Sequence, residues 1–104
     1  MRKYKNVPIT FLKTGENVTA LFEVCAENER EVACFTAVVP VRLDYDEMLD
    51  IQVGENEFPF KIMHIGNLTG DLPFSIEMYV RQVGTFSTGR WEKILRGVLD
   101  ESKR

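Results

Sequence analysis

The chain has 104 residues, of which 44% are hydrophobic and 28% are charged, and its net charge is −3. This is the composition of a single globular domain, and it excludes an intrinsically disordered chain. No apolar run approaches the roughly 18 residues that a membrane-spanning helix needs, and no apolar stretch follows the basic N-terminus as it would in a secretion signal. We therefore expect one cytoplasmic domain over residues 1–104 that does not enter a membrane.

Charge is distributed unevenly along the chain. Residues 1–13 carry four basic and no acidic residues, residues 14–80 carry thirteen acidic and three basic residues, and residues 81–104 carry six basic and three acidic residues. Affinity for nucleic acid depends mainly on neutralising phosphates. The acidic middle of the chain therefore disfavours general nucleic-acid binding, unless the two basic ends of the chain meet in the fold.

Alternation of apolar and polar residues predicts that most of the chain is β-structure. A basic tail over residues 1–6 precedes the first strand. Residues 32–41 are apolar on both faces, which is typical of a central strand buried from two sides. Turns that contain Gly, Asn or Asp separate the strands. The predicted strands are residues 7–11, 18–25, 32–41, 48–53, 58–65 and 74–81.

Two further elements complete the predicted fold. Within residues 44–50, Asp44 followed by Glu47 is a capping-box pattern that indicates either a short helical turn or a loop. Residues 89–101 are predicted to form a helix, because five apolar residues recur on one stripe of it. We predict a mainly β (α+β) fold: a small antiparallel barrel or strongly curved sheet of five to six strands with one C-terminal amphipathic helix.

The stretch GTFSTGRW, residues 84–91, lies just before the predicted helix. Its two glycines have the spacing of a nucleotide-binding phosphate loop. That loop needs Lys and then Ser or Thr after its second glycine, whereas Arg90 and Trp91 stand there. The stretch therefore does not predict a nucleotide hydrolase.

The same stretch supports a weaker hypothesis of anion binding. The free N–H groups of a helix N-terminus attract anions in any fold. The side chains that would bind the phosphate of a small molecule or of a nucleic-acid end are Arg81, Ser87, Thr88 and Arg90. The alternative is that Ser87 or Thr88 only caps the helix.

Residues that often carry chemistry are few. His64, the only histidine, alternates in phase with Phe58, Phe60 and Ile62, so we expect it on the apolar face as a core residue. One histidine and two cysteines without CxxC spacing are a poor metal-binding set. We predict no metal site, no cofactor and no catalytic residues; a small enzyme that uses His64 or Cys34 is the least favoured alternative.

The two cysteines, Cys25 and Cys34, flank the turn at residues 28–30. A hairpin there would place them nearly opposite each other on paired strands. A cross-strand disulfide is geometrically conceivable, whereas reduced thiols are usual in a cytoplasmic protein. The sequence leaves both states open.

Aromatic residues and arginine are enriched at binding surfaces. Tyr79 lies on the polar face of its predicted strand beside Arg81, and Phe86 stands in a loop as either a core residue or an exposed anchor. These three residues are the predicted partner-binding set. The leading hypothesis is a small non-enzymatic binding module that acts through a protein partner or by self-association, and the alternative is the phosphate receptor described above.

In size and in its order of strands followed by a helix, the chain is similar to PilZ-type receptors of cyclic dinucleotides. Those receptors carry an N-terminal Arg-x-x-x-Arg motif and a later Asp/Asn-x-Ser-x-x-Gly motif. Here Asn6 stands at the second arginine position after Arg2, and Asn67-Leu68-Thr69-Gly70 is a fragment of the second motif. The resemblance implies a β-rich architecture and carries over no binding residues.

Overall fold

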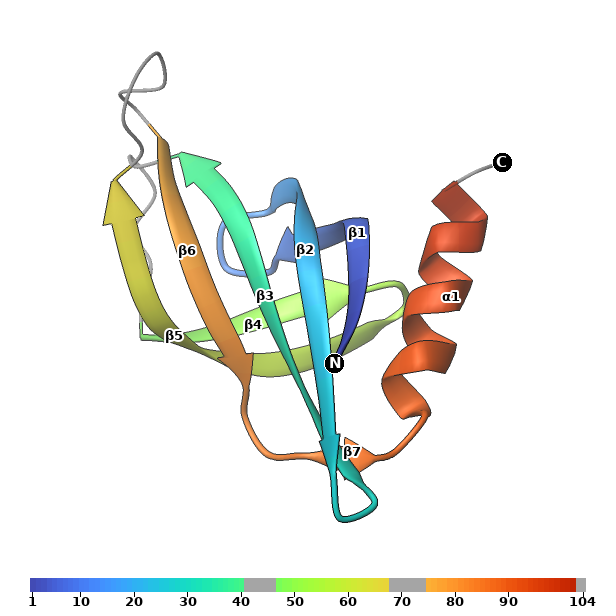
Figure 1. Cartoon of the computed structure of the whole chain (residues 1–104). Helices are drawn as coiled ribbons and strands as arrows, with labels where there is room; N and C mark the ends of the chain where they lie inside the picture. The colour runs from blue at the N-terminus through green and yellow to red at the C-terminus, as the bar shows by residue number, and fades with distance from the viewer. Residues whose placement is uncertain (41–46, 68–74, 103–104) are drawn as a thin grey trace.

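The computed structural model describes residues 1–40, 47–67 and 75–102 (Figure 1). Within them, seven strands are followed by one helix. Of the predicted helical turn at residues 44–50, residues 44–46 lie outside the described residues, and residues 48–50 belong to a strand. The elements are β1 (Arg2–Phe11), β2 (Glu16–Glu27), β3 (Arg30–Pro40), β4 (Met48–Val53), β5 (Asn56–Asn67), β6 (Ser75–Gln82), β7 (Phe86–Ser87) and α1 (Arg90–Ser102).

All strand pairings in the described residues are antiparallel, and they close into a ring. The order of neighbours is β2-β1-β4-β5-β6-β3-β7, and an additional pairing of β2 with β3 joins the two ends of the six long strands. Within the ring, β1 and β4 share a short stretch of pairing, which consists only of Thr10↔Gln52 and Phe11↔Ile51. The predicted mainly antiparallel fold with one C-terminal helix is confirmed.

Strand β5 bends so that its two halves serve different neighbours. Residues 56–61 pair with β4, whereas residues 60–67 pair with β6. An irregularity between Ile62 and His64 inserts Met63 as an extra residue opposite β6. This β-bulge bends the strand, which is how a short sheet turns a corner.

The N-terminus differs from its prediction as a tail. Arg2, Lys3 and Tyr4 pair with β2, so the first strand begins at Arg2. A second bulge separates this part from Val7, and Asn6 takes up the extra length with a φ of 57°. Asn tolerates this left-handed conformation better than most residues. The basic character of the segment concealed a strand, in which Arg2, Lys3 and Tyr4 pair with Val24, Glu23 and Phe22 of β2.

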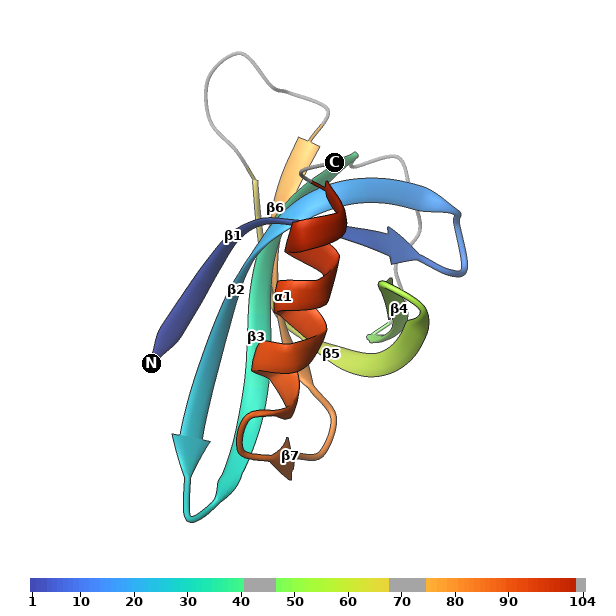
Figure 2. The same ribbon diagram turned by 90° about the vertical axis from the view of Figure 1, so that its right-hand side faces the viewer.

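Helix α1 lies across the opening between β1 and the β4–β5 hairpin (Figure 2). Its amphipathic stripe, as predicted, faces inward, with Trp91 and Leu95 fully buried and Val98 nearly so. The Trp91 ring contacts Phe22 and Phe58, at centroid distances of 5.7 Å and 4.9 Å. The helix thus fills the part of the ring where β1 and β4 stop pairing.

The core is one continuous cluster inside the ring. Most of its residues alternate along the strands, as the sequence pattern predicts. No helix among the described residues is long and apolar enough to cross a membrane. The largest fully buried side chains are Trp91, Phe11, Phe22, Phe35, Phe60, Ile51, Met78 and Leu95.

Candidate functional site

The N-terminus of α1 is occupied by a carboxylate of the protein itself. Glu31, on β3, is only 4% exposed. Its two oxygens accept hydrogen bonds from the backbone N–H groups of Gly89, at 3.1 Å, and of Trp91, at 2.7 Å. A carboxylate satisfies these otherwise unpaired donors and also complements the helix dipole. Glu31 therefore stands where an external phosphate would bind.

A second buried polar side chain, Gln82, holds the Trp91 ring in place. Its Oε1 accepts hydrogen bonds from the indole N–H of Trp91, at 2.8 Å, and from the backbone N–H of Ala33, at 2.9 Å. The Nε2 of Gln82 has no hydrogen-bond partner among the described residues. Together, Glu31 and Gln82 bind both the backbone and the ring of Trp91 and fix the start of the helix to β3.

The residues predicted to bind phosphate do not gather into one site. Ser87, Thr88 and Arg90 have exposed side chains around the loop, and the guanidinium of Arg90 lies 4.4 Å from the centre of the Phe86 ring. Arg81 is paired with Cys34 and Lys61 on the outer face of the sheet. The loop itself is tied to β3 by the guanidinium of Arg30, which donates to the side chain and carbonyl of Thr85.

The predicted partner-binding residues, like the predicted phosphate-binding residues, do not lie together. Phe86 is half-buried, and its ring packs on Trp91 and Phe58 at 5.4 Å and 5.7 Å. The sequence left open whether Phe86 packs against the core or is an exposed anchor. In the structure it packs against the core. Tyr79 and Arg81 both lie on β6 with their side chains exposed on the outer face of the sheet.

Tyr79 stands at the centre of an exposed patch that we name the Tyr79 face. Tyr79 is 37% exposed, Val38 44% and Met63 52%. The register places Thr36 of β3 and His64 of β5 directly across from Tyr79. Charged residues on neighbouring positions of the same face form its rim: Glu23, Lys61, Glu77 and Arg81.

The phenol of Tyr79 titrates abnormally because of its neighbours on this face. Its pKa is raised to about 12, first by hydrogen bonding with Cys34, then by partial burial, and then by the negative charges of Cys34, Glu23 and Cys25. The neutral phenol therefore persists across the physiological range. It remains a hydrogen-bonding group rather than a charge.

The structure corrects the placement of His64. The sequence pattern puts His64 on the core face, but the bulge at Met63 reverses the alternation, and His64 is exposed on the outer face beside Tyr79. Since the side-chain period of a strand is two, one inserted residue moves every later residue to the other side. No sequence signal distinguishes Met63 as the inserted residue.

The cysteines are also placed differently from a directly opposed pair. Cys25 pairs with Val32, and Cys34 pairs with Glu23, so the two cysteines are diagonal neighbours. Both are free thiols. Diagonal positions are about 7–8 Å apart, which is beyond the usual span of a disulfide without backbone movement.

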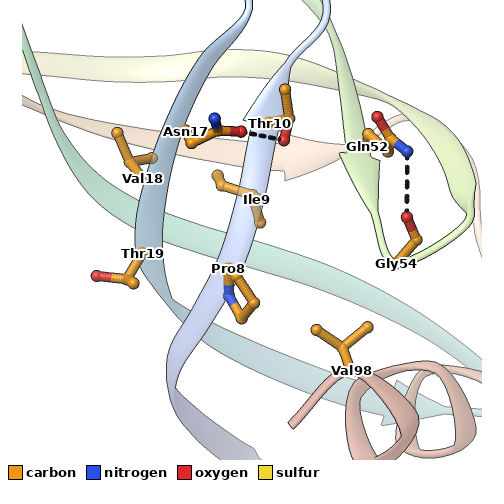
Figure 3. A pocket seen from close by; sticks show the side chains of 9 residues that line it. All are labelled: Pro8, Ile9, Thr10, Asn17, Val18, Thr19, Gln52, Gly54 and Val98. Atoms are coloured by element: carbon orange, nitrogen blue, oxygen red, sulfur yellow. Dashed lines mark hydrogen bonds between the residues drawn. The ribbon is translucent and has the colours of Figure 1, made fainter. Parts of the chain in front are cut away.

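A groove of ≈ 650 Å³ opens where β1, β2, the end of β4 and α1 meet (Figure 3). Sequence reasoning did not identify it. Among the described residues, its lining contains hydroxyl, carboxamide and aliphatic groups but no charged side chain. The lining residues are Pro8, Ile9, Thr10, Asn17, Val18, Thr19, Gln52, Gly54 and Val98. The available signal was Pro8, because proline inside a predicted strand marks a place where the hydrogen-bond ladder stops.

In the parts of the chain that the structure describes, no group of three or more His, Cys, Asp or Glu side chains is arranged to hold a metal ion. No family model, curated protein or solved structure matches the chain. The resemblance to PilZ-type receptors thus gains no support from these comparisons. Function must be inferred from the surfaces described above.

Proposed function

We propose that the protein is a small, cytoplasmic, non-enzymatic binding module that acts through a protein partner or by self-association, and that the Tyr79 face is its contact surface. The observation that carries the proposal is that Tyr79 and Val38 are exposed on one face of β6 and β3, next to the exposed Met63 in the bulge of β5, with charges of both signs around them. An apolar and aromatic centre with a polar rim is the usual anatomy of a protein interface. Single exposed apolar residues are ordinary, whereas a cluster marks a contact site.

The rigidity of this face supports the proposal. Tyr79 stands on a strand that is paired on both sides, with β3 and with β5. A contact residue that is already ordered loses little conformational entropy on binding. Tyrosine is also among the residues that most often dominate the energy of an interface.

The phosphate-receptor alternative is less favoured for a specific reason. The donors at the helix N-terminus already bind Glu31. Phosphate would have to displace a carboxylate that is almost fully buried, and the displaced charge would then lack its partners. Arg90 is drawn to the Phe86 ring instead.

The proposal is tested by placing a photo-crosslinking amino acid at Tyr79 in one variant and at Ser87 in a control variant. Ser87 is exposed on β7, away from the Tyr79 face. We expect a discrete covalent adduct at position 79, with the protein itself or with another protein, and none at position 87. The partner so identified should bind the purified Tyr79→Ala variant at least about 30-fold more weakly, as removal of a central interface residue does.

Two results would contradict the proposal. One is equal crosslinking at positions 79 and 87, which indicates random collision. The other is an unchanged affinity of Tyr79→Ala for the crosslinked partner. Sedimentation velocity of the wild type over a wide concentration range distinguishes self-association from binding of another protein.

A further inference from the structure

The groove of Figure 3 exists because the ladder between β1 and β4 is interrupted. Leu12 donates its backbone N–H to the carbonyl of Asp50, and the register then runs Phe11↔Ile51 and Thr10↔Gln52. Hydrogen-bonded pairs alternate along an antiparallel ladder. Continuing this register would place Pro8 opposite Gly54 as the next hydrogen-bonded pair. Proline has no N–H, so the pairing ends there and the strands separate.

This interruption leaves strand-pairing groups directed into the groove. The carbonyl of Pro8 lies on the side of β1 that faces β4, because it belongs to the hydrogen-bonded phase of the ladder. Pro8 cannot donate a hydrogen bond to the carbonyl of Gly54. That carbonyl instead accepts a hydrogen bond from the side-chain Nε2 of Gln52, at 3.2 Å. A carboxamide thus substitutes for the missing peptide N–H.

The other polar groups of the groove are also uncharged groups that donate or accept hydrogen bonds. The hydroxyl of Thr10 donates to Oδ1 of Asn17 at 2.6 Å, and the Nδ2 donors of Asn17 have no partner among the described residues. The Oε1 of Gln52 is an available acceptor by the same reasoning. Thr19 adds an exposed hydroxyl, and Pro8 and Val98 add aliphatic surface.

We propose that this groove binds an extended peptide segment whose side chains at the bound positions are uncharged. Its peptide groups would pair with the Pro8 carbonyl and with the carboxamides of Asn17 and Gln52. The groove matches such a segment in charge, because 28% of the chain is charged, yet no charged residue lines the groove in the part of the chain that the structure describes. A charged side chain would lose hydration there without gaining a partner. The volume also falls in the range of roughly 300–1,000 Å³ typical of binding sites.

This inference is independent of the Tyr79 face, because the two sites share no residue. The Tyr79 face lies on β3, β5 and β6, whereas the groove is formed by β1, β2, the end of β4 and α1. Failure of one proposal therefore leaves the other intact. A partner protein that used both surfaces would be held at two sites.

The test uses a random heptapeptide library displayed on phage, selected against the purified full chain. Selections run in parallel against Thr19→Arg, which places a cation in the groove, and against Ser87→Arg, an equal change outside it. We expect wild type and Ser87→Arg to enrich the same peptides, depleted in Asp, Glu, Lys and Arg. Binding of these peptides to Thr19→Arg should be at least about tenfold weaker, a difference of about 1.4 kcal/mol.

Amide NMR spectra then locate the contact. The enriched peptide should shift signals of residues 9–10, 17–19, 52–54 and 98 and leave those of Tyr79 unchanged, and Tyr79→Ala should bind it as wild type does. The proposal is overturned if no peptide is enriched above background, if enriched peptides bind Thr19→Arg equally, or if their signals map to the Tyr79 face. A neutral oligosaccharide that shifts the groove signals where enriched peptides do not would assign the groove to another ligand class.

Discussion

The carboxylate of Glu31 on β3 accepts a hydrogen bond of 2.7 Å from the backbone N–H of Trp91, sixty residues later in the chain. The same side chain binds Gly89, so the first turn of α1 is capped from a distant strand rather than by its own preceding residues. Ser87 and Thr88, the caps expected from local sequence, are exposed. The start of the helix is therefore determined by tertiary structure.

Replacing Glu31 should destabilise the fold. Glu31→Ala leaves two helix N–H groups without an acceptor, and each buried unpaired donor costs about 1–3 kcal/mol. We expect urea denaturation to show a loss of about 2–4 kcal/mol. The matched control is Glu27→Ala, because Glu27 is an exposed carboxylate in the same hairpin. A loss below about 0.5 kcal/mol, the range of ordinary surface substitutions, would show that the capping interaction is dispensable.

Gly54 is required by the close approach of the helix. Its φ is +64°, and a Cβ there would stand 2.9 Å from Cγ2 of Val98. Gly15 has a similar φ of +75°, but nothing lies within 4 Å of its added Cβ. Gly54→Ala should therefore cost more stability than Gly15→Ala, which carries only the backbone strain of roughly 1 kcal/mol. Thermal unfolding of the two variants measures the difference, and equal losses would show that the helix adjusts freely.

The titration of Tyr79 predicts a loss of stability at high pH. Its folded-state pKa of about 12 lies above the ordinary tyrosine pKa of 10.0. The unfolded chain therefore releases this proton first, so the contribution to stability is complete below pH 10 and is lost as pH rises towards 12. Ultraviolet titration of tyrosine ionisation should resolve one late group. Because Cys34 is the main cause, Cys34→Ala should lower the pKa of Tyr79; titration of all three tyrosines together near 10 would contradict this prediction.

Phosphate should not bind at the start of the helix. In a thermal-shift assay with inorganic phosphate and with cyclic dinucleotides, we expect no change in Tm, because Glu31 occupies the N–H groups. A ligand at 100 times its Kd would add about 2.7 kcal/mol, so binding would be evident. A rise in Tm for the wild type that is absent from Arg90→Ala would restore the phosphate-receptor hypothesis.

Much of the fold could be predicted because its core lies on one side of each strand. The alternation of Ile76, Met78 and Val80 with exposed residues identifies β6 correctly, and the helical stripe places Trp91 inward. Such patterns arise from burial alone and need no knowledge of neighbours.

The features that escaped prediction depend on irregularity or on distant contacts. The bulge at Met63 reversed the expected orientation of His64, and no residue type announces a bulge of this kind. Glu31 resembles its exposed neighbours Glu27 and Glu29 in sequence, and only the approach of α1 makes it a buried cap. The groove likewise requires the register of β1 against β4, which local patterns do not contain.

The position of Trp91 has a consequence for biosynthesis. All six long strands precede it in the chain, yet its ring contacts Phe22, Phe58 and Phe60 at their centre. During translation Trp91 emerges from the ribosome after all six long strands, so the strands are exposed before the side chain that fills their interior. The aromatic residues of the nascent strands therefore stay accessible until Trp91 emerges. A chaperone would be most useful in this interval.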